Sequence, residues 1–255
     1  FYEVHEKRLH NFFIAIIPLI IGVVITFLIM LQPDLGTAII FALLTGIVFF
    51  SSPVPKLIKL KVVFLFLGMI ILVSAVLIMT GGSFLQERQI ERFNFTRPCD
   101  RLLDTGNQVC NGYISINNGG LTGVGLGNST QKYLYLPYPY TDFIFAVIVE
   151  ELGLVVGIGI ILAYMYLLYR ILKIGRESYT NRGALICYGV AVYIFLHVSV
   201  NLMGLFGLMP MTGVPLPFMS YGGSFTLCLM VALTMVQRVN IETKLRDTVS
   251  KKEKK

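Results

Sequence analysis

Asp142 stands at the junction between two very different stretches of the chain. The polar, proline-broken segment Leu136–Tyr140 lies before it, and a long apolar stretch begins after it at Phe143. The junction predicts a carboxylate at a membrane surface, where it could act as a general base on a substrate carried by a lipid. It could also cap the helix that follows, because Asp before an apolar run is a common helix start. The residues alone leave both roles open.

A glycine-rich run, Gly119–Ser129, precedes this junction and is followed closely by Lys132. Glycines this dense let a backbone approach another surface closely, and they can present amide groups to an anion. Flexible turns are the alternative interpretation. A dinucleotide site would need a strand before the glycines and a helix after them. We therefore expect no nucleotide cofactor.

The composition predicts the kind of protein that must position these residues. Hydrophobic residues form 55% of the chain, charged residues form 14%, and the mean hydropathy is +0.75. A soluble domain could not cover its surface with so few charges. We expect one all-α integral membrane domain over residues 1–255, because about 20 apolar residues cross about 30 Å of hydrocarbon. The predicted bundle has six transmembrane helices: Phe12–Leu31, Leu35–Phe50, Val62–Met79, Phe143–Leu168, Ala184–Leu208 and Ser220–Gln237.

The basic residues predict the orientation. With the amino end inside, sixteen of the 21 Lys and Arg residues lie in cytoplasmic segments, and the other five lie in the long connection 81–141. The positive-inside rule therefore places both ends in the cytoplasm and the 81–141 loop outside. The net charge of +7 collects in juxtamembrane turns and the basic tail. This pattern indicates attraction to anionic lipid and argues against a nucleic-acid partner.

The outer connection of about 60 residues is longer than connection requires, which is typical of a functional or disordered loop. Its many apolar residues between Phe93 and Ile116 predict short helices that lie on the bundle. Cys99 and Cys110 both fall in this loop, where they form either a loop-closing disulfide or two free thiols. We favour the disulfide.

Four motifs resemble the SEDS family (shape, elongation, division and sporulation) in order and spacing. They are Gln32–Ala38, Gly119–Lys132, Thr141–Ala146 with Glu150–Gly153, and Gly213–Ser224. The resemblance covers essentially the whole chain but only the carboxy-terminal six of the family's ten spans, so we expect a fragment. The glycine-rich motif is more similar to the division-type, FtsW-like members than to the elongation type. One departure is Tyr138, where those sequences usually carry Glu.

The resemblance implies a peptidoglycan glycosyltransferase of the bacterial cell membrane that polymerises lipid II at the division septum. The family's essential aspartate matches Asp142, which assigns it the role of general base. A lipid pyrophosphate is already a good leaving group, so cations and no second carboxylic acid are needed. The implied partners are lipid II, the growing glycan strand, a class B penicillin-binding transpeptidase and other divisome membrane proteins. A divalent cation, Mg²⁺ or Mn²⁺, is an implied cofactor with unassigned protein ligands.

Two sets of residues are expected to surround Asp142. The substrate-binding set is Lys132, Gln131, Asn128, Ser129, Arg101, Ser220 and Tyr221, with Arg88, Arg92 and Arg97 as further cations for the phosphates. The cavity-structuring set is Glu150, Glu151, Asn201 and Asp34.

The cavity-structuring set rests on the cost of polar groups in a membrane. The two glutamates lie about 12 Å beyond Asp142 on a helix, where ionisable groups normally face a cavity or the bundle interior. Asn201 shares a helix face with His197, which predicts interhelical hydrogen bonding. Asp34 follows a proline and precedes an apolar run, so helix capping is favoured there. The segment 210–224 is expected to be a re-entrant or surface loop over the cavity.

Two other classes of function remain open at this point. A lipid II transporter would also need polar residues within its spans and an outward loop. A divisome scaffold would use the loop only to bind a partner.

Overall fold

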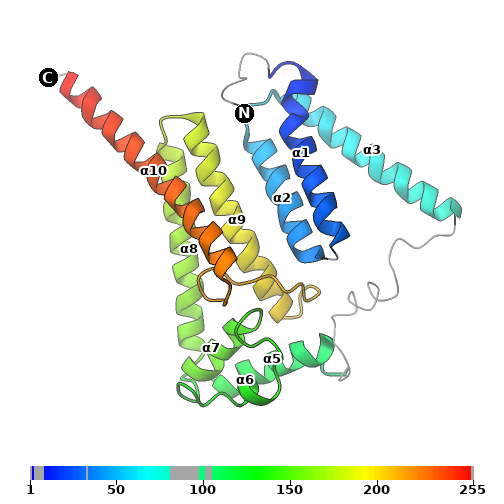
Figure 1. Cartoon of the computed structure of the whole chain (residues 1–255), viewed down its shortest axis with the longest axis vertical. Helices are drawn as coiled ribbons and strands as arrows, with labels where there is room; N and C mark the ends of the chain where they lie inside the picture. Colours follow the sequence, from blue (N-terminus) through cyan, green and yellow to red (C-terminus); the bar gives the residue numbers. More distant parts are fainter. Residues whose placement is uncertain (1, 3–8, 33, 81–97, 101–104, 254–255) are drawn as a thin grey trace.

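The computed structural model describes residues 2, 9–32, 34–80, 98–100 and 105–253 (Figure 1). The described residues form helices and no strand, which confirms the all-α prediction. The helices are α1 Phe12–Leu31, α2 Leu35–Ser51, α3 Lys56–Thr80, η2 Pro98–Asp100, α5 Thr105–Gly119, α6 Thr130–Leu134, α7 Ile144–Leu152, α8 Leu154–Glu177, α9 Asn181–Leu205 and α10 Gly223–Glu253.

Four helices of the described part are long and apolar enough to cross a membrane. They are α1, α8, α9 and the Gly223–Arg246 part of α10, and α2 is a shorter apolar helix. Large apolar side chains along α1, such as Phe27 and Leu31, are exposed. Such continuous apolar surface is stable in lipid and not in water. The prediction of a membrane protein is therefore confirmed, whereas the six spans and their orientation stay predictions.

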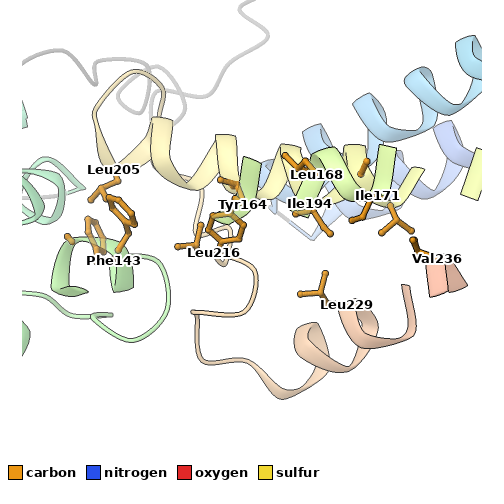
Figure 2. Packing of buried hydrophobic residues seen from close by; sticks show 14 of the residues in the cluster. Phe143, Tyr164, Leu168, Ile171, Ile194, Leu205, Leu216, Leu229 and Val236 are labelled. Carbon is orange, nitrogen blue, oxygen red and sulfur yellow. The ribbon is translucent and has the colours of Figure 1, made fainter. Parts of the chain in front are cut away.

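Helix α9 lies at the centre of the bundle, where it packs against α2, α8 and α10 (Figure 1). Its buried residues join the main hydrophobic core, in which Ile194 of α9 lies with Tyr164 and Leu168 of α8 and Leu229 of α10 (Figure 2). Because α9 packs against three neighbours, its polar side chains His197 and Asn201 are buried.

The predicted span Phe143–Leu168 is wrong as a single helix. The chain breaks at Gly153, which has φ 87° and separates α7 from α8. A Cβ at this position would lie 2.3 Å from the carbonyl oxygen of Leu121, so only glycine allows the close approach. Apolarity alone could not reveal this break, since its cause lies about 30 residues earlier in the chain.

Helices α5, α6 and α7 gather at the end of the bundle where α9 ends and α10 begins (Figure 1). Helix α5 packs closely there, because a Cβ on Gly112 would lie 3.0 Å from Leu205 of α9 and 3.2 Å from the Phe143 ring. The prediction of helices within the outer connection is confirmed by α5 and α6. Residues 93–97 and 101–104, which that prediction also included, lie outside the described residues.

A disulfide joins Cys99 of η2 to Cys110 of α5, which confirms the favoured pairing. We expect the double variant Cys99→Ser, Cys110→Ser to lower the free energy of unfolding by at most about 3 kcal/mol, because the bond closes a short loop. Denaturant unfolding in detergent measures this change, with Cys228→Ser, an unbonded exposed thiol, as the control. Alkylation of both Cys99 and Cys110 in native, unreduced protein would show that the bond is absent.

Candidate functional site

Asp142 lies in the turn that leads into α7, with its side chain partly buried. Helix α7 has Phe143 at its N-cap position and no side-chain cap hydrogen bond. Helix capping therefore does not account for Asp142. Asp34 contrasts with it, because its carboxylate accepts a hydrogen bond of 3.1 Å from the amide of Thr37 and caps α2.

Burial raises the pKa of Asp142 above its ordinary value, and a hydrogen bond from the Thr141 side chain only partly opposes this effect. Desolvation disfavours the charged form of a carboxylate and makes it a stronger proton acceptor. A carboxylate with a raised pKa is better matched to general-base catalysis near neutral pH than an exposed one.

The backbone around Asp142 is held by the segment between α9 and α10. Ser220, predicted to bind substrate, donates from its hydroxyl to the carbonyl of Thr141 at 2.6 Å. Asn201 of α9, predicted to structure the cavity, donates to the carbonyl of Asp142 at 3.0 Å. The Tyr221 amide donates to the carbonyl of Tyr140, while the Tyr221 side chain is 83% exposed. The structure thus brings Ser220, Tyr221 and Asn201 next to Asp142.

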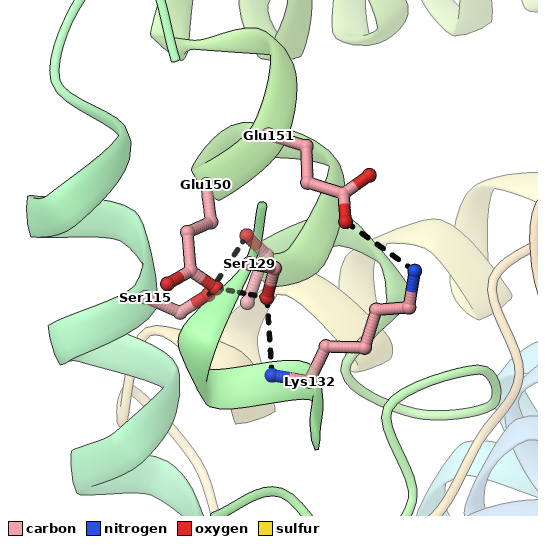
Figure 3. A network of polar contacts seen from close by, with 6 residues as sticks. Ser115, Ser129, Lys132, Glu150 and Glu151 are labelled. Atoms are coloured by element: carbon pink, nitrogen blue, oxygen red, sulfur yellow. Dashed lines mark hydrogen bonds and ion pairs between the residues drawn. The ribbon is translucent and has the colours of Figure 1, made fainter. Parts of the chain in front are cut away.

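A second polar cluster surrounds the carboxylate of Glu150, which is only 1% exposed (Figure 3). One of its oxygens accepts from Ser115 of α5 at 2.9 Å and from Ser129 at 2.5 Å. Its other oxygen lies 3.3 Å from the Thr130 hydroxyl and 3.5 Å from the Asn118 amide. Four donors from two segments thus stabilise a buried charge that would otherwise be very costly.

Lys132 lies next to this cluster, and its backbone amide donates to the Ser129 hydroxyl at 3.0 Å. Its ammonium is 3.3 Å from the carboxylate of Glu151 and lies over the rings of Tyr133 and Tyr140, at 5.0 Å and 5.7 Å from their centroids (Figure 3). Burial alone would lower the pKa of Lys132, but the hydrogen bond and charge of Glu151 outweigh it, and the pKa is raised. The cation is therefore firmly protonated close to the Tyr140–Asp142 turn.

The other predicted substrate-binding residues on this side have different surroundings, and Asn128 is exposed. Gln131 is buried, and its Oε1 has no hydrogen-bond partner. Asn128 donates from its side chain to the carbonyl of Val124 at 3.2 Å. Arg101, together with Arg88, Arg92 and Arg97, lies outside the described residues.

The glycine-rich run packs its backbone directly on the end of α7. The amides of Val124 and Gly125 donate to the carbonyls of Glu150 and Glu151, at 2.9 Å and 3.0 Å. A Cβ on Gly123 would lie 2.3 Å from the Glu151 carbonyl oxygen. These glycines therefore serve close backbone approach, and the two amides are engaged by the protein instead of an anion.

Sequence reasoning left four positions of the site out of its candidate sets. Ser115, Asn118 and Thr130 contact Glu150, and a Cβ on Gly213 would lie 3.4 Å from Oδ2 of Asp142. Thr130 and Gly213 stand in motifs that the sequence did single out and Asn118 borders the glycine-rich run, whereas nothing local distinguishes Ser115. The described residues hold no group of three or more His, Cys, Asp or Glu side chains that could bind a metal ion.

We expect Glu150→Gln to lower the free energy of unfolding by about 2 kcal/mol. The new NH₂ group would face hydrogen-bond donors instead of acceptors, and the remaining hydrogen bonds would no longer be made to a charged group. Denaturant unfolding measures the loss. Glu177→Gln is the matched control, since it breaks only an exposed pair with Lys173 and should change stability by less than about 0.5 kcal/mol. Equal stability of the two variants would remove the structural role of the Glu150 cluster.

Comparison with known proteins shows which proteins this chain is similar to. The chain is 35% identical over 237 residues to the "Probable peptidoglycan glycosyltransferase FtsW" of Bacillus subtilis (strain 168), covering 92% of this chain and 59% of that protein. The protein of the same name from Lactococcus lactis is 37% identical over 228 residues, covering 86% and 53%. The chain thus spans little more than half the length of these relatives.

Two solved structures share the fold. One, described as "Structural coordination of polymerization and crosslinking by a peptidoglycan synthase complex", matches with a TM-score of 0.66 and 26% identity, over 89% of this chain and 61% of that one. The other, a mutant of the Thermus thermophilus rod shape determining protein RodA, has a TM-score of 0.56 and 22% identity, over 94% and 62%.

The family model for FtsW/RodA/SpoVE cell cycle proteins matches residues 2–245. This match covers almost the entire chain, and with it the Asp142 turn, the Glu150 cluster and the segment between α9 and α10. The chain belongs to the FtsW/RodA/SpoVE family of cell cycle proteins.

Proposed function

We propose that this chain performs the chemistry of a peptidoglycan glycosyltransferase that polymerises lipid II into glycan strands during cell division. Relatives at 35% and 37% identity carry the name peptidoglycan glycosyltransferase FtsW, which supports the reaction class. The observation that carries the proposal is the environment of Asp142. This carboxylate is partly buried and has a raised pKa, and α7 begins without a side-chain cap.

In the proposed reaction, Asp142 accepts the proton of the acceptor sugar's 4-hydroxyl while that oxygen attacks the anomeric carbon of the donor. The bond from the anomeric carbon to the lipid pyrophosphate breaks on the opposite face, so the configuration inverts. The pyrophosphate leaves with the electron pair, and its negative charge is stabilised by the Lys132 ammonium. The leaving group needs no proton from a second carboxylic acid.

The proposed reaction could use a divalent cation. Mg²⁺ typically uses one or two carboxylates together with substrate phosphates. An Mg²⁺ or Mn²⁺ ion that takes part would be held in this way and would offset the negative charge of the pyrophosphate. No step of the proposed mechanism depends on it.

The membrane placement and partners follow from the same proposal. We place the chain in the bacterial cell membrane at the division septum, with six spans, both ends cytoplasmic and the 81–141 connection outside. The gathering of α5, α6 and α7 at one end of the bundle (Figure 1), with Asp142 in the turn before α7, supports one outer catalytic face. The likeness to a structure from a peptidoglycan synthase complex supports a penicillin-binding transpeptidase and other divisome proteins as partners, beside lipid II and the glycan strand.

We expect Asp142→Asn to slow lipid II polymerisation by about 10²–10⁴-fold, because the general base is lost, while lipid II binding hardly changes. Asp142→Glu should also be largely inactive, since proton transfer needs a set distance. Lys132→Ala should weaken both binding and turnover. The assay is polymerisation by the full-length protein with its cognate transpeptidase, and the control is Lys244→Ala, an exposed lysine near the carboxy end.

Near wild-type polymerisation by Asp142→Asn would remove the catalytic role. Loss of lipid II translocation with unchanged polymerisation would instead favour a transporter. Intact partner binding with no polymerisation by the wild-type complex would favour a scaffold.

The rate should also depend on pH in a defined direction. Asp142 must be unprotonated to act as a base, and burial raises its pKa. Polymerisation should therefore fall as the pH is lowered, and the midpoint of this fall should lie above the ordinary pKa of an exposed Asp, which is about 3.9. A pH–rate profile measured at saturating lipid II tests this expectation. A rate that stays constant down to that ordinary value would contradict it.

A further inference from the structure

We propose that Asn201 and Ser220 are positioning residues for Asp142. They hold the backbone of Thr141 and Asp142 against the segment 212–220 and thereby set the point at which the carboxylate meets the acceptor hydroxyl. This inference rests on the proposed function of Asp142 as the general base.

Three successive carbonyls before α7 each accept a hydrogen bond from the same region. The carbonyl of Tyr140 accepts from the backbone amide of Tyr221 at 2.8 Å. The carbonyl of Thr141 accepts from the Ser220 hydroxyl at 2.6 Å. The carbonyl of Asp142 accepts from the side-chain amide of Asn201 at 3.0 Å. Backbone carbonyls that are removed from water need partners. The first helical hydrogen bond of α7 runs from the Val147 amide to the Phe143 carbonyl. The three carbonyls before Phe143 therefore depend on partners outside α7.

Asn201 joins three elements through one amide group. Its Nδ2 also donates to the carbonyl of Val214 at 2.8 Å, so both of its N–H groups bond to backbone. The side chain is only 3% exposed and projects from the central helix α9. It therefore links the start of α7 and the segment before α10 to the most enclosed helix of the bundle.

Ser220 makes the second link. Its hydroxyl accepts from the amide of Leu216 at 2.7 Å while it donates to Thr141, and the residue is 7% exposed. The single hydroxyl hydrogen is thus already committed to the protein. This geometry fits a positioning role better than direct substrate binding.

The segment that carries these bonds is itself fixed on several sides. A Cβ on Gly36 of α2 would lie 2.6 Å from the Thr212 side chain, and Val214 packs with Ile40 of α2. The Tyr164 hydroxyl of α8 donates to the carbonyl of Pro217. Supports of this kind hold a functional side chain to within about 0.5 Å.

The chemistry explains why such support matters. A general base must approach the proton that it removes within about 2.6–3.2 Å between heavy atoms. A displacement of about 1 Å can cost about 10²-fold in rate. Loss of either hydrogen bond should therefore affect turnover more than substrate binding.

The test is the kinetics of lipid II polymerisation by full-length protein carrying Ser220→Ala or Asn201→Ala. We expect kcat to fall by about 10- to 10²-fold while KM for lipid II changes little. Ser220→Thr, which keeps the hydroxyl, should recover much of the rate. Thr234→Ala is the control, because it removes a hydroxyl-to-carbonyl bond of 2.8 Å on α10 and should leave kcat unchanged.

Both alanine variants folded with wild-type kcat would overturn the inference. A fall in kcat accompanied by an equal change in KM, without recovery in Ser220→Thr, would also overturn it by indicating general disruption. If Asn201→Ala does not fold, the comparison of kcat between Ser220→Ala and Ser220→Thr tests the inference. An Asp142→Asn variant that still polymerises lipid II would refute the proposed function itself. If Asp142→Asn is inactive but Ser220→Ala and Asn201→Ala polymerise at the wild-type rate, only the positioning role is refuted.

Discussion

The buried negative charge of Glu150 is the constraint around which the end of the protein that holds α5, α6 and α7 is organised. A carboxylate that is only 1% exposed is stable only when donors converge on it. Those donors come from α5 and from the end of the glycine-rich run, and Ser115 and Ser129 lie 35 and 21 residues before Glu150 in the sequence. Satisfying one charge therefore fixes where α5, α6 and α7 meet, and with them the position of Lys132.

The second requirement is a break in the apolar helix directly after this charge. Gly153 turns the chain between α7 and α8, and the carbonyl groups exposed at the end of α7 accept the amides of Val124 and Gly125. Backbone thus completes the hydrogen bonding that the interrupted helix loses. The glycines allow this contact because a side chain on either surface would fill the space. Helix α7, with Asp142 in the turn before it, is therefore a short helix separate from α8.

Sequence reasoning reached the elements whose causes are local. The bounds Phe12–Leu31 of α1 agree with the prediction, because the run between an Asn and a Gln is hydrophobic at every position except Pro18, Gly22 and Thr26. The prediction of Asp142 as a general base depended on the family motif around it, because its place at a helix start fits a helix cap equally well. The contacts of Ser115 with Glu150 and of Asn201 with Asp142 span 35 and 59 residues, and no periodic pattern encodes bonds over such distances.

The Cys99–Cys110 bond carries a consequence for how the protein matures. Disulfides form and persist in oxidising surroundings and are rare where thiols are kept reduced. If the 81–141 connection lies outside, as proposed above, this bond can close only after the segment has crossed the membrane. The attachment of η2 to α5 would then be among the last steps of biogenesis, later than insertion of the helices on either side.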